Sequence, residues 1–253
     1  MPSVDTVKDL ENLVEKLRNA KTLIFDYDGT IAPLNVPRSE SKVYPEIYDA
    51  LSRLSHRYMI AIATTKDCNF VIRRTPFATL WICSNGFEIR YKDLSIVHSS
   101  VLDRYEDFLM FLQLVYRIAS DLDIEIKYVG RVPVGVCVDW RWRGKPEDAR
   151  KVVEISKSYG FHVVEYPGRP FVDIFVYSID KGWALTKCLE LGIIRRPIVY
   201  FGDSENDVPA FRIADVSIQL VHDENKNLDL GAQYRIEREV LFKLLELLSQ
   251  DKD

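Results

Sequence analysis

Three short apolar segments, each followed at once by polar residues, constrain the fold of this 253-residue chain more than any other feature. They cover residues 22–25, 59–63 and 197–201. Uninterrupted runs of this length are typical of strands that helices bury on both faces of a parallel sheet. We therefore predict a doubly wound, Rossmann-like α/β fold. Apolar residues at helical spacing predict its helices over residues 4–19, 45–57, 181–191 and 237–248.

The middle of the chain alternates between apolar and polar residues with a period of two, which predicts a half-exposed antiparallel sheet. We expect its strands over residues 124–129, 134–141, 161–166 and 171–176, with helices near 103–121 and 146–159 covering the apolar face. That face would hold Ile124, Ile126, Val134, Val136, Val138, Trp140, Val172 and Ile174. The opposite face would carry Glu125, Lys127, Asp139, Arg141 and Asp173. We predict an α/β cap over residues 88–177, inserted into a core of residues 1–87 and 178–253.

Composition and charge exclude several classes of protein. A formal net charge of −4 provides no broad basic surface for nucleic acid. The longest apolar run, residues 58–63, is far too short for a membrane span, which needs roughly 18 residues. Residues 1–5 show no basic region leading into an apolar one, so we expect a cytoplasmic protein. No CxxC pair is present, and we interpret the cysteines as buried thiols in a reducing compartment. They are Cys68, Cys83, Cys137 and Cys188.

Carboxylates follow two of the apolar segments. Asp26 and Asp28 come after the first, and Asp203 and Asp207 come after the last. If both strands are central and parallel, Asp26, Asp203 and Asp207 meet at one edge of the sheet. Three such carboxylates repel one another unless a divalent cation binds them, and an all-oxygen site favours Mg²⁺. Each pair alone also has a plainer interpretation, since Asp-Gly is a common turn and Asp207 could cap a helix.

A carboxylate at such a site can attack phosphorus and form an aspartyl phosphate. The reaction needs positive charge beside it, which Lys181 could supply, and Thr64 could contribute a hydroxyl. Asp28 could protonate the departing alkoxide and then activate water. Taken alone, Lys181 could be an ordinary surface lysine, and Thr64 could merely end a strand.

In this order, residues 25–30, Thr64, Lys181 and residues 202–207 resemble the four motifs of the haloacid dehalogenase superfamily of phosphatases. An insertion between the second and third motifs is, in this superfamily, the cap that selects the substrate. The resemblance implies that Asp26 is the nucleophile and that Asp28 is the general acid and base. Thr64 and Lys181 would contact phosphate. The implied magnesium ligands are Asp26, the backbone carbonyl of Asp28, Asp203 and Asp207.

The sequence also resembles trehalose-6-phosphate phosphatases and their archaeal relatives, through residues 31–34, residues 83–89 and the cap. In that family the cap presents a Glu-x-Lys pair, an arginine after the next strand and a Gly-Lys-x-x-x-Glu segment. Glu125, Lys127 and Arg141 match the first two features. The third has Arg169 for Lys and Asp173 for Glu, and Asp139 replaces a histidine near the cap arginine. At the second motif, Thr65 and Lys66 replace Gly and Arg, which loses the guanidinium fork. The predicted substrate contacts are Thr65, Lys66, Glu125, Lys127, Arg141, Arg169, Asp173 and Asn206.

The resemblance implies a magnesium-dependent phosphatase whose substrate is trehalose 6-phosphate or a related sugar phosphate. Independently of the resemblance, a polar cap face suits several hydroxyls. Lys127, Arg141 and Arg169 could instead bind a second anionic group, which leaves mannosyl-3-phosphoglycerate and sucrose phosphate open. A phosphosugar mutase, which also uses an aspartyl phosphate, is a further alternative. A non-catalytic regulatory subunit is the alternative from another class. We expect a small-molecule partner and a monomer or small homo-oligomer.

Overall fold

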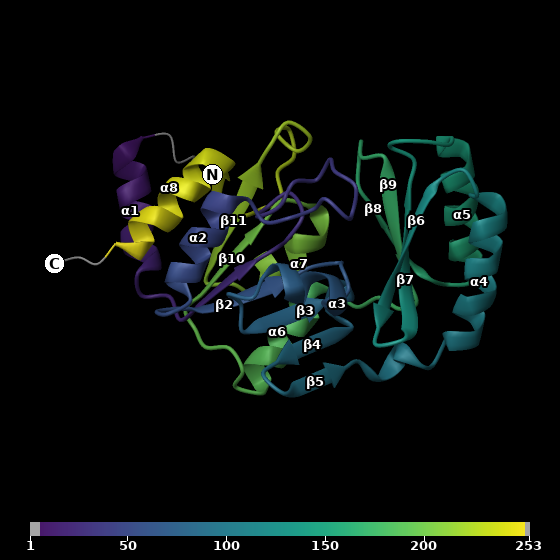
Figure 1. Cartoon of the computed structure of the whole chain (residues 1–253), viewed down its shortest axis with the longest axis horizontal. Helices are drawn as coiled ribbons and strands as arrows, with labels where there is room; N and C mark the ends of the chain where they lie inside the picture. The colour runs from purple at the N-terminus through teal and green to yellow at the C-terminus, as the bar shows by residue number, and fades with distance from the viewer. Residues whose placement is uncertain (1–5, 251–253) are drawn as a thin grey trace.

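The computed structural model describes residues 6–250 and contains two sheets, which lie side by side (Figure 1). The predicted helix begins at residue 4, so its first residues lie outside the described part, as do the rest of residues 1–5 and residues 251–253. The larger sheet has the order β12-β11-β10-β1-β2-β3-β4-β5, and the smaller has the order β6-β7-β9-β8. The strands are β1 (Thr22–Phe25), β2 (Met59–Ala63), β3 (Leu80–Cys83), β4 (Glu88–Tyr91), β5 (Leu94–Val97), β6 (Asp123–Val129), β7 (Val132–Asp139), β8 (His162–Glu165), β9 (Phe171–Phe175), β10 (Ile198–Gly202), β11 (Val216–Val221) and β12 (Tyr234–Glu237).

Helices cover both faces of the larger sheet, as predicted for a doubly wound α/β fold. Apolar residues of α1, α2, α3 and α8 pack on one face, together with Leu23 and Phe25 of β1. Apolar residues of α6 and α7 pack on the other face, with Ile24. Every residue of β1 is therefore buried, which explains its uninterrupted apolar run. The helices are α1 (Val7–Leu17), α2 (Pro45–Leu54), α3 (Cys68–Val71), α4 (Tyr105–Ile118), α5 (Pro146–Ser158), α6 (Lys181–Glu190), α7 (Val208–Phe211) and α8 (Arg238–Ser249).

The three predicted strands β10, β1 and β2 are parallel neighbours at the centre of the larger sheet. Thr22 aligns with Ile198 on one side and with Met59 on the other. The carboxyl ends of these strands therefore lie at one edge, as the argument for a shared site requires. Between residues 6 and 250, no helix combines the length and the apolar composition that a bilayer crossing needs.

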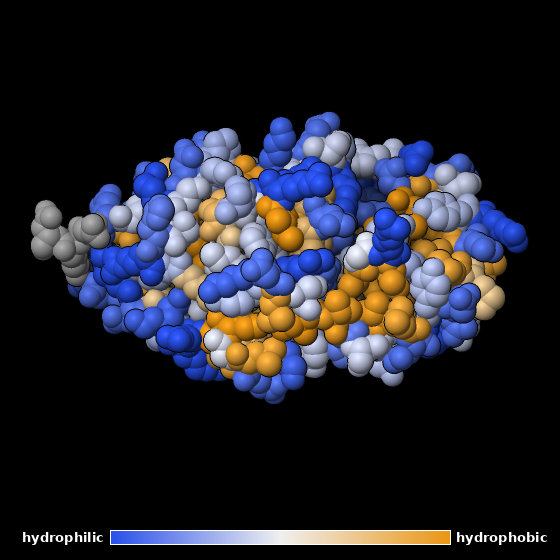
Figure 2. Space-filling model, turned by 60° about the horizontal axis from the view of Figure 1, so that its bottom comes forward, coloured by the Kyte–Doolittle hydropathy of each residue, from blue (hydrophilic) through white to orange (hydrophobic). Residues whose placement is uncertain are grey.

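The larger sheet extends further along the chain than we predicted. Positive φ angles of 49° at Ser84, 59° at Asn85 and 107° at Gly86 reverse the chain after β3. As a result, β4 pairs antiparallel with β3, and β5 pairs with β4 at the outer edge of the sheet. The predicted boundary at residue 88 is therefore wrong, because residues 88–97 belong to the larger sheet. Figure 2 shows a broad apolar area on one face of the molecule. The apolar side chains of Leu94 and Val97, both in β5, are exposed.

The smaller sheet has the two faces that the alternating pattern predicts. Val134, Val136, Val138, Val172 and Ile174 are buried in one hydrophobic cluster with residues of α4 and α5. Ile124, Ile126 and Trp140 are partly buried and pack against the same cluster. The charged face points toward a cavity that the core also lines. In Figure 1, α4 and α5 cover the side of the smaller sheet that faces away from the core.

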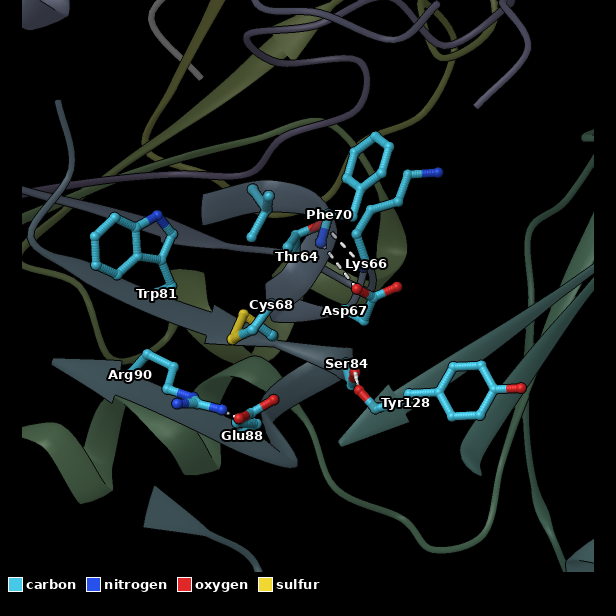
Figure 3. The surroundings of a disulfide bond; sticks show 12 residues. Thr64, Lys66, Asp67, Cys68, Phe70, Trp81, Ser84, Glu88, Arg90 and Tyr128 are labelled. Atoms are coloured by element: carbon cyan, nitrogen blue, oxygen red, sulfur yellow. Dashed lines mark hydrogen bonds and ion pairs between the residues drawn. A yellow bond between two sulfur atoms is a disulfide. The ribbon is translucent and has the colours of Figure 1, made fainter. Parts of the chain in front are cut away.

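Our interpretation of the cysteines is wrong for two of the four. A disulfide joins Cys68, at the start of α3, to Cys83, at the end of β3, across 15 positions of sequence (Figure 3). The sequence spacing showed no pair because only the packing of α3 beside β3 brings the two residues together. Cys137 and Cys188 are free thiols, and Cys188 is buried.

Candidate active site

Three carboxylates meet where the central parallel strands end. Asp26 follows β1, and Asp203 and Asp207 follow β10. All three residues are buried, and one oxygen of each lies within 4.8 Å of the others. Two glycines allow this approach, because an added Cβ would overlap the Asp203 carboxylate at Gly29 and the Asp207 carboxylate at Gly202. The parallel register thus creates the predicted acidic cluster.

Lys181 supplies the positive charge that this cluster needs. It begins α6, where the Asp180 side chain accepts a hydrogen bond from the backbone N–H of Trp183. Its side chain is fully buried, and its Nζ donates to Asp26 Oδ1 at 2.7 Å and to Asp207 Oδ1 at 2.6 Å. Burial lowers the pKa of Lys181, but the two carboxylates outweigh burial and raise it above its ordinary value. The ammonium therefore stays charged.

Asp26 lies in an environment that disfavours its charged form. Burial raises the pKa of Asp26 most, and the carboxylates of Asp207 and Asp203 raise it further, against the attraction of Lys181. The attraction of Lys181 is thus insufficient to offset the burial of Asp26 beside two other carboxylates. This imbalance favours an additional cation at the cluster.

The oxygen atoms of Asp203 fit the role of a magnesium ligand. Its Oδ2 lies 3.1 Å from Arg169 Nη2 and 2.9 Å from His222 Nε2. Its Oδ1 is buried and has no hydrogen-bond partner among the described residues. Burial raises the pKa of Asp203, but His222 and Arg169 outweigh it and lower the pKa below its ordinary value. An ionised carboxylate with one unpartnered oxygen is what a cation would bind, so these residues fit Mg²⁺.

Asp207 is held by other groups. Its Oδ1 accepts from Lys181 and from the Tyr200 hydroxyl at 2.7 Å. Its Oδ2 accepts from the backbone N–H groups of Asp203 at 2.9 Å and Ser204 at 3.1 Å. Asp207 belongs to the cluster, but its observed contacts hold Lys181 and the turn after β10.

The loop after β2 carries Thr64, which we predicted to contact phosphate, and Thr65 and Lys66, which we predicted to contact the substrate. Thr64 is buried, and its hydroxyl accepts from the backbone N–H of Lys66 at 3.1 Å. Thr65 and Lys66 line the cavity, whereas Thr64 is not one of its lining residues. Lys66 Nζ is 3.5 Å from Asp28 Oδ2 and 3.4 Å from Glu125 Oε2. Lys66 therefore links Asp28 of the core to Glu125 of the cap.

A cavity of about 550 Å³ lies between the core and the smaller sheet. Asp26, Asp28 and Asp203 form part of its core wall. The predicted cap and loop residues that line it are Thr65, Lys66, Glu125, Lys127, Arg141, Arg169, Asp173 and Asn206. The structure thus brings all the predicted substrate contacts to one cavity, whose floor is the acidic cluster.

The charged groups on the cap wall already have partners, either in the cap or in the core. Lys127 Nζ lies 3.3 Å from Asp173 Oδ1, and the Tyr166 hydroxyl donates to Asp173 Oδ2 at 2.9 Å. Arg141 Nη1 donates to the backbone carbonyl of Leu34 at 2.7 Å. These contacts hold the cap wall in place and connect it to the loop after β1.

Sequence reasoning missed several residues that complete the site. Arg38 pairs with Glu125 and Asp67, Tyr166 contacts Asn206 and Asp173, and His222 contacts Asp203. None lies in one of the four motifs. The only available signal was for Arg38, a cation in the long loop that follows the first motif.

Comparisons with known proteins find similarity to hydrolases and phosphatases. The family model of haloacid dehalogenase-like hydrolases matches residues 140–237. A trehalose-6-phosphate phosphatase-related protein of Thermoplasma acidophilum is 25% identical over 240 residues, which cover 91% of this chain and 99% of the relative. Phosphoglycolate phosphatase 2 of Saccharolobus solfataricus is 26% identical over 203 residues, or 78% of each protein.

A solved structure shows the same fold over nearly the whole chain. The C-terminal domain of the C. albicans trehalose-6-phosphate phosphatase aligns with a TM-score of 0.75 at 14% identity, covering 95% of this chain and 96% of that one. The chain is therefore similar to the haloacid dehalogenase-like hydrolases, whose family model matches residues 140–237, and it shares its fold with a trehalose-6-phosphate phosphatase.

Proposed function

We propose that this protein is a magnesium-dependent phosphatase that hydrolyses a sugar phosphate, trehalose 6-phosphate or a related ester. One observation carries the proposal: the Asp26 carboxylate, beside the buried Lys181, forms the floor of a cavity whose opposite wall is charged. Such a cavity can bind the phosphate at the floor and several sugar hydroxyls at the wall. The T. acidophilum relative and the polar cap wall support this substrate class.

The residues of the floor have complementary roles. Asp26 attacks phosphorus, and the bond between phosphorus and the sugar oxygen breaks as Asp28 donates a proton to that oxygen. Asp28 then removes a proton from water, which attacks phosphorus and frees both Asp26 and inorganic phosphate. Lys181 stabilises the negative charge beside Asp26 throughout. Asp26 and Asp203 would hold Mg²⁺, which when bound adds positive charge that keeps Asp26 ionised.

The test is phosphate release from a panel containing trehalose 6-phosphate, sucrose 6-phosphate, phosphoglycolate and an aryl phosphate, with and without Mg²⁺. We expect turnover only in the presence of Mg²⁺. The turnover rate of Asp26→Asn should be lower by a factor of about 1,000 or more, because the variant lacks the nucleophile. Asp49→Asn, the same change at an exposed position of α2, is the control and should retain full activity. Turnover by Asp26→Asn at the normal rate, or none by the native protein on any ester, contradicts the proposal.

A phosphate ester that also carries a carboxylate is a second candidate substrate. The S. solfataricus relative and the cavity cations Lys66, Lys127 and Arg141 favour it. The same panel distinguishes the two classes, since this candidate predicts a preference for phosphoglycolate over both sugar phosphates. Recovery of an isomerised phosphate ester in place of free phosphate would instead indicate a mutase.

A further inference from the structure

The disulfide lies next to the loop that we assign to phosphate binding. Cys68 follows Lys66 by two residues, and Cys83 directly precedes the turn Ser84–Gly86. Both cysteines are buried, and their Cα atoms are 5.3 Å apart. Figure 3 shows the cross-link between the segment that carries Thr64 and Lys66 and the segment that carries Ser84. The bond thus joins the segment after Lys66, which lines the cavity, to the turn Ser84–Gly86.

The turn after Cys83 holds the phosphate loop through backbone hydrogen bonds. The backbone N–H of Ser84 donates to the carbonyl of Lys66 at 2.7 Å. The backbone N–H of Asn85 donates to the carbonyl of Thr64 at 3.0 Å. The position of the loop that presents Lys66 therefore depends on the position of this turn.

The same turn contacts the cap and the segment that leads back to the core. The Ser84 hydroxyl donates to the carbonyl of Tyr128, on the cap strand β6, at 3.1 Å (Figure 3). The Asn85 side-chain amide donates to the carbonyl of Ile179 at 2.7 Å, two residues before Lys181. One turn therefore touches the phosphate loop, the cap and the approach to the buried lysine.

The backbone of this turn is strained. Ser84 and Asn85 both have positive φ angles, 49° and 59°, a region that side chains with a Cβ disfavour. Such a conformation persists only where its surroundings impose it. The disulfide fixes the residue directly before the turn, and it is the covalent restraint in these surroundings.

We propose that the Cys68–Cys83 disulfide positions the phosphate-binding loop and the cap through Ser84 and Asn85, an inference that rests on the proposed function. Without the bond, the two left-handed residues relax toward ordinary φ angles, and the Lys66 and Tyr128 carbonyls lose their partners. Phosphate affinity and closure of the cap then fall before the core unfolds. Cleavage by a dithiol such as dithiothreitol transfers two electrons and two protons to the sulfur atoms and leaves the dithiol as its own disulfide.

The experiment compares the native protein with Cys68→Ala/Cys83→Ala, in the presence of Mg²⁺. Calorimetric titration with inorganic phosphate should give about tenfold weaker binding in the variant, the loss expected when one charged contact is misplaced. Hydrogen exchange should be faster at residues 64–66, 84–86 and 128 at temperatures below unfolding. The control is Cys188→Ala, which removes a buried thiol that forms no cross-link. It should lower thermal stability without changing phosphate affinity.

A rescue variant separates positioning from simple stabilisation. Glycine adopts positive φ without strain, so adding Ser84→Gly to the double variant should restore phosphate affinity. It should not restore protection of the cap, because it also removes the hydroxyl that donates to Tyr128. If the double variant does not fold, dithiothreitol-reduced native protein replaces it.

The outcomes separate this inference from the proposed function. Native phosphate affinity and native exchange at residues 64–66 in the cross-link-free protein would overturn the inference and leave the phosphatase proposal intact. If the native protein itself binds no phosphate, the phosphatase proposal fails. In that case, hydrogen exchange at residues 84–86 that is the same with and without the disulfide would still refute positioning by the disulfide.

Discussion

Replacing Glu125 with glutamine measures how strongly charge joins the cap to the core. The Glu125 carboxylate pairs with Arg38, with Lys66 Nζ at 3.4 Å and with Lys127 Nζ at 3.7 Å. Its side chain is 22% exposed, so solvent screens these pairs only in part. Burial alone would raise the pKa of Glu125, but the charges of Lys66, Lys127 and Arg38 outweigh burial and lower it to about 2.

The difference between this pKa and the ordinary value of 4.5 gives the expected magnitude. At about 1.4 kcal/mol per pH unit, it corresponds to about 3 kcal/mol of stability in the charged form. Because the folded pKa is depressed, this contribution is complete above pH 4.5 and is lost as the pH falls toward 2. At pH 3.5, about 2 kcal/mol should remain.

Urea unfolding of the native protein and of Glu125→Gln at pH 7 and pH 3.5 is the assay. We expect the variant to be less stable by about 3 kcal/mol at pH 7 and by about 2 kcal/mol at pH 3.5. Glu154→Gln, the same change at an exposed position of α5, is the control and should have no effect at either pH. A difference below about 1 kcal/mol at pH 7, or one that does not narrow in acid, would refute the reasoning.

Three further substitutions test the site. Asp28→Asn should slow hydrolysis of a sugar phosphate about 100-fold but should not slow hydrolysis of an activated aryl phosphate, because the aryl leaving group needs no proton. Equal losses of the steady-state rate on both substrates would contradict the role of Asp28 as the acid. Arg141→Ala should raise the KM for the sugar phosphate about tenfold and leave that for the aryl phosphate unchanged, since Arg141 lines the cap wall of the cavity, which only the larger ester would reach. Gly29→Ala should weaken Mg²⁺ binding at least tenfold, as measured by calorimetry. The added Cβ would overlap the Asp203 carboxylate, and Gly29 has a φ of 79°, which alanine disfavours. An unchanged Mg²⁺ affinity would show that the close approach of Gly29 to Asp203 is dispensable.

The central strands could be predicted because the signal for each one lies within its own short stretch of sequence. Helices bury both faces of β1, β2 and β10, so the three predicted segments are apolar over nearly their whole length. Each segment ends where the polar edge of the sheet begins. The outer strands lack this signal. In β4 and β5, a hairpin turn with φ of 51° at Lys92 joins two short strands at an edge, where burial is incomplete.

The acidic floor could also be predicted, because the motif residues follow strands whose parallel pairing brings them together. The supporting contacts could not, since they depend on packing between distant segments. Arg38 reaches Glu125 across 87 positions, and His222 reaches Asp203 from the segment after β11. The same limit hid the disulfide, whose cysteines meet only after α3 packs beside β3.

The two layers of the molecule differ in what joins them. The larger sheet has an apolar cluster on each face and the smaller sheet has a third. Across the cavity the cap meets the core through charged and polar groups such as Arg169 with Asp203. Apolar contact between them is concentrated near the connecting segments, where the Phe87 and Phe175 rings stack. If the cap moved away from the core, water would therefore reach the charged side chains between them, and the apolar clusters would stay covered. Movement of the cap away from the core would therefore create no new exposed apolar patch of the kind that promotes aggregation.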